Sequence, residues 1–123
     1  MSQDIVADAL NEIKNAKRAN KKEIEIKNYS KLLISVLALA KLKGYIQDYK
    51  TGKILKIELG KLNDCGAIKP RFTVTVPEIE KYEKRYLPAK DMGMLVITTS
   101  KGLITNQTAK EKNIGGSLIA YIY

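Results

Sequence analysis

The chain has 123 residues, of which 45% are hydrophobic and 28% are charged, a composition that fits one compact domain or two small lobes with an ordered core. The 22 lysines and arginines outnumber the 13 aspartates and glutamates, which gives a formal net charge of +9 at pH 7. A field of this sign attracts polyanions, so the balance favours a nucleic acid as the partner. The single cysteine excludes an internal disulfide bond, and the absence of histidine excludes a zinc site built from the usual nitrogen and sulfur ligands.

No apolar run in the sequence approaches the ~20 residues that a membrane-spanning helix needs. The chain begins with the polar residues Ser2-Gln3-Asp4 rather than with the basic and then apolar stretches of a secretory signal. We therefore expect a cytoplasmic protein without a membrane partner.

The first element is predicted to be an amphipathic helix. Apolar residues recur at three- and four-residue spacing from Ile5 to Ala16, with acidic residues near the start and basic residues near the end, where they complement the helix dipole. Asn20 and the lysines after it close this helix. Residues 23–27 then alternate between polar and apolar, as a half-buried strand does.

A second helix and a hairpin follow. The helix has an apolar face that begins after Asn28 or Ser30, either of which can cap it, and that ends at Gly44. Residues 45–59 are predicted to form a β-hairpin around a tight turn in which Gly52 can take a positive φ. The first half of the chain therefore has the predicted order α-β-α-β-β.

Turn-forming residues are concentrated between residues 60 and 70, where both periodicities break down. We place the boundary of two lobes there, with an N-terminal α/β lobe at residues 1–62 and a mostly β C-terminal lobe at residues 63–123. The second lobe is predicted to begin with a strand at 71–76 that Pro77 stops, a short helical turn at 78–84 and a strand at 94–99. A short strand at 103–104 and a brief helix follow, and the helix is capped by Thr105 or Asn106 and continues to 112. The chain is predicted to end in a strand at 118–123. The predicted fold class is α/β, with short helices in the second lobe.

The side chains offer little for catalysis. Without histidine, a general base near neutral pH would have to be another side chain in a special environment. Tyr86 and Lys90 have the spacing used by some nicotinamide-dependent reductases, but Pro88 would break the helix that presents such a pair. Ser100 and Lys101 are adjacent in a predicted extended segment and point to opposite faces, which hinders proton transfer between them. We expect no catalytic residues, no metal, no cofactor and no small-molecule substrate.

A compact polar segment follows the apolar residues of the strand at 94–99. It contains three hydroxyls, one cation and one glycine, in the order Thr98, Thr99, Ser100, Lys101 and Gly102. Hydroxyls and main-chain groups can meet RNA 2′-hydroxyls, phosphates and base edges, while Lys101 can neutralise a phosphate and Gly102 lets backbone approach closely. An ordinary junction between a strand and a turn would explain the same residues equally well.

Two further segments have features of an RNA contact. The segment Gly115-Gly116-Ser117 permits either a tight turn or the close approach of another backbone. Arg85, Tyr86 and Lys90 combine a stacking ring with two cations, although the ring could equally belong to the core.

Basic residues outside these segments are candidates through charge alone. In the first helix, Lys14, Asn15 and Arg18 could follow a phosphate backbone together with the lysines that come after the helix. Lys69 and Arg71, which flank a proline, are interpreted in the same way. A charged face is more often merely solvated, so this interpretation depends on the net charge and not on the spacing of the residues.

Several of these segments belong to one recognisable pattern. The run Thr98-Thr99-Ser100-Lys101-Gly102-Leu103-Ile104-Thr105, then Ala109 and Lys110, then Gly115-Gly116 and the final strand resemble the carboxyl-terminal signature of the eighth small-subunit ribosomal protein family. The resemblance extends to the helix near the amino terminus and covers nearly all of the chain. The segments 65–72 and 85–90 resemble the archaeal and eukaryotic branch of the family.

The resemblance implies two α/β lobes and a structural constituent of the small ribosomal subunit. It also implies direct binding to an irregular helix in the central domain of small-subunit ribosomal RNA during assembly, beside neighbouring ribosomal proteins and without a cofactor. The main RNA-contact loop of the family carries over onto Thr98-Thr99-Ser100-Lys101, and its glycine pair onto Gly115 and Gly116. Bacterial members contact RNA with a glutamate after that pair, where this chain has Ser117.

A generic nucleic-acid-coating protein remains the alternative. Such a protein binds any strand with a steep salt dependence, usually through exposed aromatic side chains. The chain has 7 tyrosines, 1 phenylalanine and no tryptophan, and the sequence shows no obvious stacking row. We therefore favour specific binding to ribosomal RNA.

Overall fold

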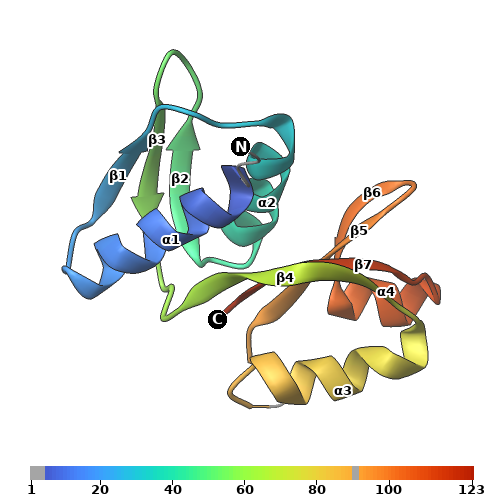
Figure 1. The fold of residues 1–123 in the computed structure, drawn as a ribbon. Coiled ribbons are helices and arrows are strands. Elements are labelled where there is room, and N and C mark those ends of the chain that lie inside the picture. The colour runs from blue at the N-terminus through green and yellow to red at the C-terminus, as the bar shows by residue number, and fades with distance from the viewer. Residues whose placement is uncertain (1–4, 90–91) are drawn as a thin grey trace. The chain divides into compact units, whose positions relative to one another are not determined.

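The computed structural model describes residues 5–89 and 92–123, and the chain divides into two compact units, Met1–Gly66 and Ala67–Tyr123 (Figure 1). The boundary predicted from the sequence lies after residue 62. The chain continues in the first unit beyond that point, where Cys65 is 1% exposed and its thiol donates a hydrogen bond to the carbonyl oxygen of Leu10 at 3.4 Å. This contact ties the end of the first unit to its first helix.

The first unit contains two helices and a three-stranded sheet, in the predicted order α-β-α-β-β. Its elements are α1 (Ile5–Arg18), β1 (Glu23–Ile26), α2 (Lys31–Leu42), β2 (Ile46–Lys50) and β3 (Leu55–Leu59). β3 lies between β1 and β2 and is antiparallel to both. α1 contacts β1 and α2, and α2 contacts β2, so both helices pack on this sheet. The predicted architecture of this half is confirmed.

Local signals define the helix ends of the first unit. Ser30, rather than Asn28, is the N-cap of α2, and its hydroxyl accepts a hydrogen bond from the N–H of Leu33 at 3.3 Å. Asn20 takes a φ of 59° after α1, and Gly44 takes a φ of 84° after α2. Because asparagine and glycine tolerate the left-handed conformation better than other residues, they end these helices as the sequence predicted.

The turn between β2 and β3 differs from the prediction at Gly52. Among the described glycines, positive φ values occur at Gly44, Gly93 and Gly102, and not at Gly52. Both polar backbone groups of Gly52 instead bond to one phenol: its N–H donates to the Tyr29 hydroxyl at 3.1 Å, and that hydroxyl donates to the Gly52 carbonyl oxygen. The turn is therefore held by a distant side chain, which the local sequence could not indicate.

The second unit consists mainly of a four-stranded sheet with two short helices, as predicted. Its elements are β4 (Cys65–Val74), α3 (Val76–Tyr86), β5 (Met94–Thr99), β6 (Gly102–Thr105), α4 (Asn106–Lys112) and β7 (Gly116–Ile122). The strand order is β4-β7-β5-β6, and β5 is antiparallel to both of its neighbours. α3 contacts α4, and α4 contacts β5 and β6.

Two predictions about the start of this unit are wrong. Residues 65–70 were expected to be irregular, but they form the first part of β4. β4 is an edge strand, where a proline such as Pro70 is tolerated because no second neighbour needs its missing N–H. Val76 was expected in a strand but lies in α3, because Thr75 and Glu78 form a helix start. The Glu78 carboxylate accepts the Thr75 N–H at 2.9 Å and the Thr75 hydroxyl at 2.8 Å, and these two donors lower its pKa.

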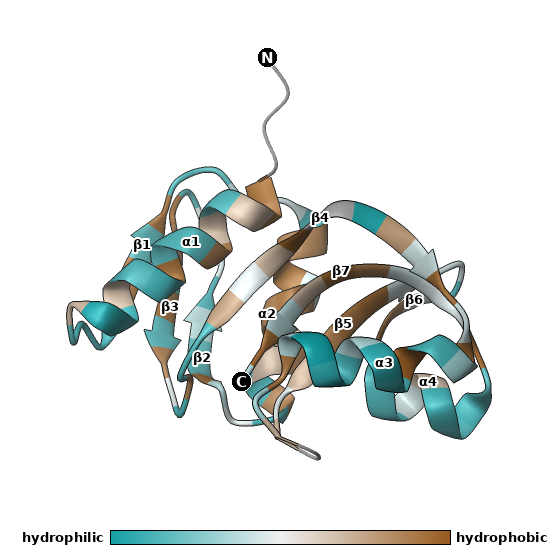
Figure 2. Cartoon of the chain, turned by 60° about the horizontal axis from the view of Figure 1, so that its bottom comes forward, coloured by the Kyte–Doolittle hydropathy of each residue, from teal (hydrophilic) through white to brown (hydrophobic). Residues whose placement is uncertain are grey.

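A hydrophobic cluster joins the helices of the second unit to its sheet. Its buried members are Ile68, Val74, Ile79, Leu87, Leu95, Ile97, Ala109 and Leu118. Figure 2 shows hydrophobic residues along β5 and the middle of β7, and hydrophilic residues over much of α3 and α4. Within residues 5–89 and 92–123, no helix is long and apolar enough to cross a membrane.

Candidate nucleic-acid interface

The polar segment after β5 forms a tight hairpin turn into β6. Thr99 and Gly102 are paired across the two strands, so Ser100 and Lys101 are the turn residues, and both are exposed. Gly102 takes a φ of 115°, a value that favours glycine. The expectation that Ser100 and Lys101 lie in an extended segment is therefore wrong, because they form the tip of a hairpin.

The Thr99 hydroxyl is used inside this turn. It donates a hydrogen bond to the Gly102 carbonyl oxygen at 2.8 Å and accepts one from the N–H of Lys101 at 3.1 Å. Since a hydroxyl has one proton and two lone pairs, a single acceptor position is left for any other contact. Thr98, the preceding strand residue, points to the opposite face of the sheet. The two neighbouring threonines therefore have different surroundings.

The glycine pair allows the start of β7 to approach two other segments closely. A Cβ added to Gly116 would lie 2.4 Å from the Thr98 carbonyl oxygen, and one added to Gly115 would lie 2.6 Å from the Val74 carbonyl oxygen. Ser117 is paired with Thr98 across β7 and β5. Of the two roles that the sequence left open for the glycines, the close approach of another backbone is the one observed.

The fold thus brings eight predicted contact residues to one end of the second-unit sheet. We refer to this group as the hairpin end: Thr98, Thr99, Ser100, Lys101, Gly102, Gly115, Gly116 and Ser117. Lys101 provides its one formal charge. Hydroxyls and backbone groups therefore dominate the chemistry of this surface.

Arg85 and Tyr86 lie at the other end of the same unit. The Tyr86 ring stacks on Tyr121, with centroids 5.7 Å apart and an interplanar angle of 19°. Tyr121 is four positions beyond Ser117 on β7, a separation of about 13 Å along an extended strand. The structure does not bring these residues together with the hairpin end. Lys90, the third residue predicted with them, lies outside the described residues.

Tyr86 belongs to a row of three rings that the sequence analysis did not find. Tyr121 and Tyr123 stack with centroids 6.2 Å apart, and the Arg85 guanidinium lies 5.6 Å from the centre of the Tyr86 ring. All three tyrosines are half-buried against the hydrophobic cluster. Their signal in the sequence was the i, i+2 spacing of Tyr121 and Tyr123, which places both on one face of a strand. We refer to Arg85, Tyr86, Tyr121 and Tyr123 as the tyrosine end.

The remaining candidates, which were chosen for charge, belong to both units. Lys14 on α1 is paired with Asp64, with its Nζ 3.5 Å from Oδ1, and the two side chains are 25% and 26% exposed. Asn15 and Arg18 are exposed on the same helix. Arg71 is exposed on β4, and Lys69 lies on that strand but its side chain is not among those described. Lys14 therefore has a structural contact that the sequence analysis did not foresee.

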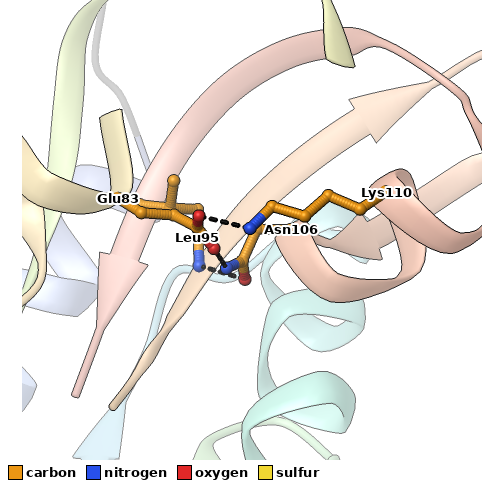
Figure 3. Close-up of polar contacts among 4 residues, drawn as sticks. All are labelled: Glu83, Leu95, Asn106 and Lys110. Carbon is orange, nitrogen blue, oxygen red and sulfur yellow. Dashed lines mark hydrogen bonds and ion pairs between the residues drawn. The ribbon is translucent and has the colours of Figure 1, made fainter. Parts of the chain in front are cut away.

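A buried polar network holds α3 and α4 on the sheet (Figure 3). Asn106 is 3% exposed, and its side-chain oxygen accepts the N–H of Leu95 at 3.1 Å. Its amide nitrogen donates to the Glu83 carboxylate, which also accepts a hydrogen bond from Lys110 Nζ at 2.5 Å. The sequence suggested Asn106 only as a possible helix cap, but Thr105 takes that position. Asn106 instead links α4 to β5, the strand that leads to the hairpin end.

The described residues offer little for catalytic chemistry. Burial raises the pKa of the Cys65 thiol to about 12, so the nucleophilic thiolate is scarce near neutral pH. No group of three or more acidic or cysteine side chains within residues 5–89 and 92–123 is arranged to hold a metal ion. A pocket of about 250 Å³ is lined by residues of α3 and α4, and its walls include Glu83, Asn106 and Lys110, which bond to one another.

Comparison with known proteins relates the whole chain to one family. The family model described as ribosomal protein S8 matches residues 4–123. A protein named small ribosomal subunit protein uS8 from Nanoarchaeum equitans is 49% identical over the full length of both chains, and its namesake from Archaeoglobus fulgidus is 44% identical over the same extent. The namesake from Methanococcoides burtonii is 45% identical over 98% of this chain and 97% of the relative. The chain therefore belongs to the ribosomal protein S8 family.

Proposed function

We propose that this protein is a structural constituent of the small ribosomal subunit in the cytoplasm, where it binds small-subunit ribosomal RNA directly and stabilises the folded RNA without catalysing a reaction. Membership of the ribosomal protein S8 family supports the assignment. The observation that carries the RNA-binding role is the convergence of Thr98–Gly102 and Gly115–Ser117 at the hairpin end. Neighbouring small-subunit ribosomal proteins are the expected protein partners.

The mechanism that we propose relies on short-range contacts. Ser100 and Lys101 are exposed at the tip of the hairpin, and Gly115 is exposed just before β7. Hydroxyls and backbone groups can bond to the 2′-hydroxyls and splayed bases of irregular RNA as well as to its phosphates. The proposed target, an irregular helix in the central domain of the ribosomal RNA, is the one that the family resemblance implies.

The overall positive charge would supply affinity rather than specificity. The first unit has 13 lysines and arginines against 8 aspartates and glutamates, and the second has 9 against 5. This spread suits general attraction to phosphates, which weakens as salt screens it. Lys14, Asn15 and Arg18 in the first unit, and Arg71 in the second, are proposed to act in this way.

A generic nucleic-acid-coating protein is the less favoured alternative. Coating proteins stack successive bases on exposed aromatic rings. The tyrosine row found here is half-buried and its rings stack on one another. The aromatic side chains of the second unit therefore favour a packing role over a stacking platform.

A binding titration at high salt tests the proposal. The protein is titrated against a small-subunit RNA fragment carrying the central-domain helix and against a scrambled duplex of equal length. We expect a preference for the authentic fragment that falls by about 1–2 kcal/mol in the double variant Ser100→Ala/Ser117→Ala. Ser35→Ala is the matched control, because Ser35 is an exposed serine on α2 whose hydroxyl bonds only within its own helix turn, to the Lys31 carbonyl oxygen. Equal binding of both RNAs by the unmodified protein would refute the proposal.

A further inference from the structure

We infer that Thr99 is a positioning residue: its hydroxyl holds the hairpin turn in the shape that presents Ser100 and Lys101 to RNA. The inference deepens the proposed function and rests on it. It differs from the family resemblance, which carries all four residues from Thr98 to Lys101 over as one contact loop.

The Thr99 hydroxyl makes two hydrogen bonds within the turn. The hydroxyl proton goes to the Gly102 carbonyl oxygen at 2.8 Å, and a lone pair accepts the Lys101 N–H at 3.1 Å. These two bonds join the backbone on both sides of the turn. A hydroxyl can donate to RNA only if its proton is not already donated elsewhere. Because the Thr99 hydroxyl donates its proton within the turn, an internal role is favoured for Thr99.

The methyl group of Thr99 contacts the other segment of the hairpin end. A Cβ on Gly116 would lie 3.0 Å from the Thr99 Cγ2 atom, so the methyl group packs against the backbone of the glycine pair. Thr99 therefore contacts both segments of the hairpin end, with its hydroxyl in the turn and its methyl on Gly116. Thr98 has neither of these surroundings, because its side chain lies on the opposite face of the strand.

Three substitutions separate the roles. Thr99→Val keeps the branched shape and removes the hydroxyl, whereas Thr99→Ser keeps the hydroxyl and removes the methyl. Thr98→Val makes the same chemical change one residue earlier, on the other face. Each variant is measured as the full chain, by hydrogen exchange of the Lys101 amide without RNA and by its dissociation constant for the central-domain fragment at high salt.

We expect Thr99→Val to speed the exchange of the Lys101 amide and to weaken RNA binding about fivefold, since it removes a net hydrogen-bond contribution of about 1 kcal/mol. Thr99→Ser should restore both values to within about twofold of the unmodified protein. Thr98→Val should leave the Lys101 exchange rate unchanged, whatever its effect on RNA.

The contrary outcomes are distinct. Weaker RNA binding by Thr99→Val with an unchanged Lys101 exchange rate would mean that Thr99 touches RNA directly, and would overturn the inference. So would binding by Thr99→Val equal to that of the unmodified protein, or a loss in Thr99→Ser as large as in Thr99→Val. If the unmodified protein does not prefer the authentic fragment, the proposed function fails, whereas the exchange measurement still reports on the turn itself.

Discussion

The two ends of the second unit each pair one cation with side chains that can contact RNA, but the two ends pack differently in the fold. The pairs are Lys101 with hydroxyls at the hairpin end and Arg85 with rings at the tyrosine end. At the hairpin end the side chains are small, and two glycines let three segments approach closely. At the tyrosine end the rings are large, and they stack on one another against the core. Side-chain size therefore decides which end leaves polar groups available to a partner.

The largest loss of stability is expected from adding a side chain at Gly116, where β7 lies close to the backbone of β5. Gly116→Ala would place a Cβ 2.4 Å from the Thr98 carbonyl oxygen, and the backbone cannot yield without moving β5. We expect the free energy of unfolding to fall by about 3 kcal/mol in chemical denaturation. The control is Gly52→Ala, where the nearest atom would be 3.9 Å away and the expected change is below about 0.5 kcal/mol. Equal stability of the two variants would remove the structural reason for the glycine pair.

The tyrosine end should respond to loss of the ring and not to loss of the hydroxyl. Tyr86→Ala removes the stack on Tyr121 and should lower the free energy of unfolding by about 2 kcal/mol, as a partly buried aromatic side chain would. Tyr86→Phe keeps the ring and should change neither stability nor RNA affinity. A weaker affinity for Tyr86→Phe at unchanged stability would instead support the prediction that Tyr86 contacts RNA, and the comparison of the two ends would then fail.

The buried hydrogen bond between Asn106 and Leu95 should contribute more to stability than the ion pair between Lys110 and Glu83. Asn106→Leu leaves the Leu95 N–H without its acceptor and should cost about 2 kcal/mol in the free energy of unfolding. Lys110→Met removes the ion pair with Glu83. Because the Lys110 side chain is 42% exposed, this change should lower the free energy of unfolding by less than about 0.5 kcal/mol. Thermal unfolding of both variants checks the ranking, and a reversed order would show that the ion pair carries the stabilisation.

The smallest effect concerns salt dependence. Lys101→Met should reduce the slope of log binding constant against log salt concentration by about 0.7–0.9, the range for one phosphate contact on a single strand or a duplex. Arg85→Met should change the slope less, because the guanidinium lies over the Tyr86 ring. Titrations at several salt concentrations give both slopes. Equal changes would mean that both ends meet phosphates.

Much of the architecture could be predicted because its signals are local. The 3.6-residue period of α1 and α2, the cap at Ser30 and the alternation in β1 are properties of neighbouring residues. The strand at 94–99 was predicted with the same limits as β5. The segments of the hairpin end were also singled out from the sequence, through the family signature and the concentration of hydroxyls and glycines, and their contact with RNA stays a prediction.

The two errors have different causes, one in the sheet and one in a local helix start. The first part of β4, residues 65–70, contains glycine and proline and was expected to be irregular, because only the place of β4 at the edge of the sheet makes Pro70 acceptable. Val76 continued an alternating pattern, but the bonds between Thr75 and Glu78 start a helix there. In both cases the residue types alone allowed two conformations.

The sequence by itself determined the α/β class, the order of elements in the first half, the positive charge and the family. These follow from composition, from periodicity within one element and from motifs in consecutive residues. The tertiary structure decided that Gly116 must be small, that Thr99 bonds inside its own turn, that Asn106 is buried and that Tyr86, Tyr121 and Tyr123 form one row. The Thr99 bonds depend on the turn that forms when β5 pairs with β6. The other three features depend on which strands and helices become neighbours, and contacts between residues far apart in the chain are not encoded in any single segment.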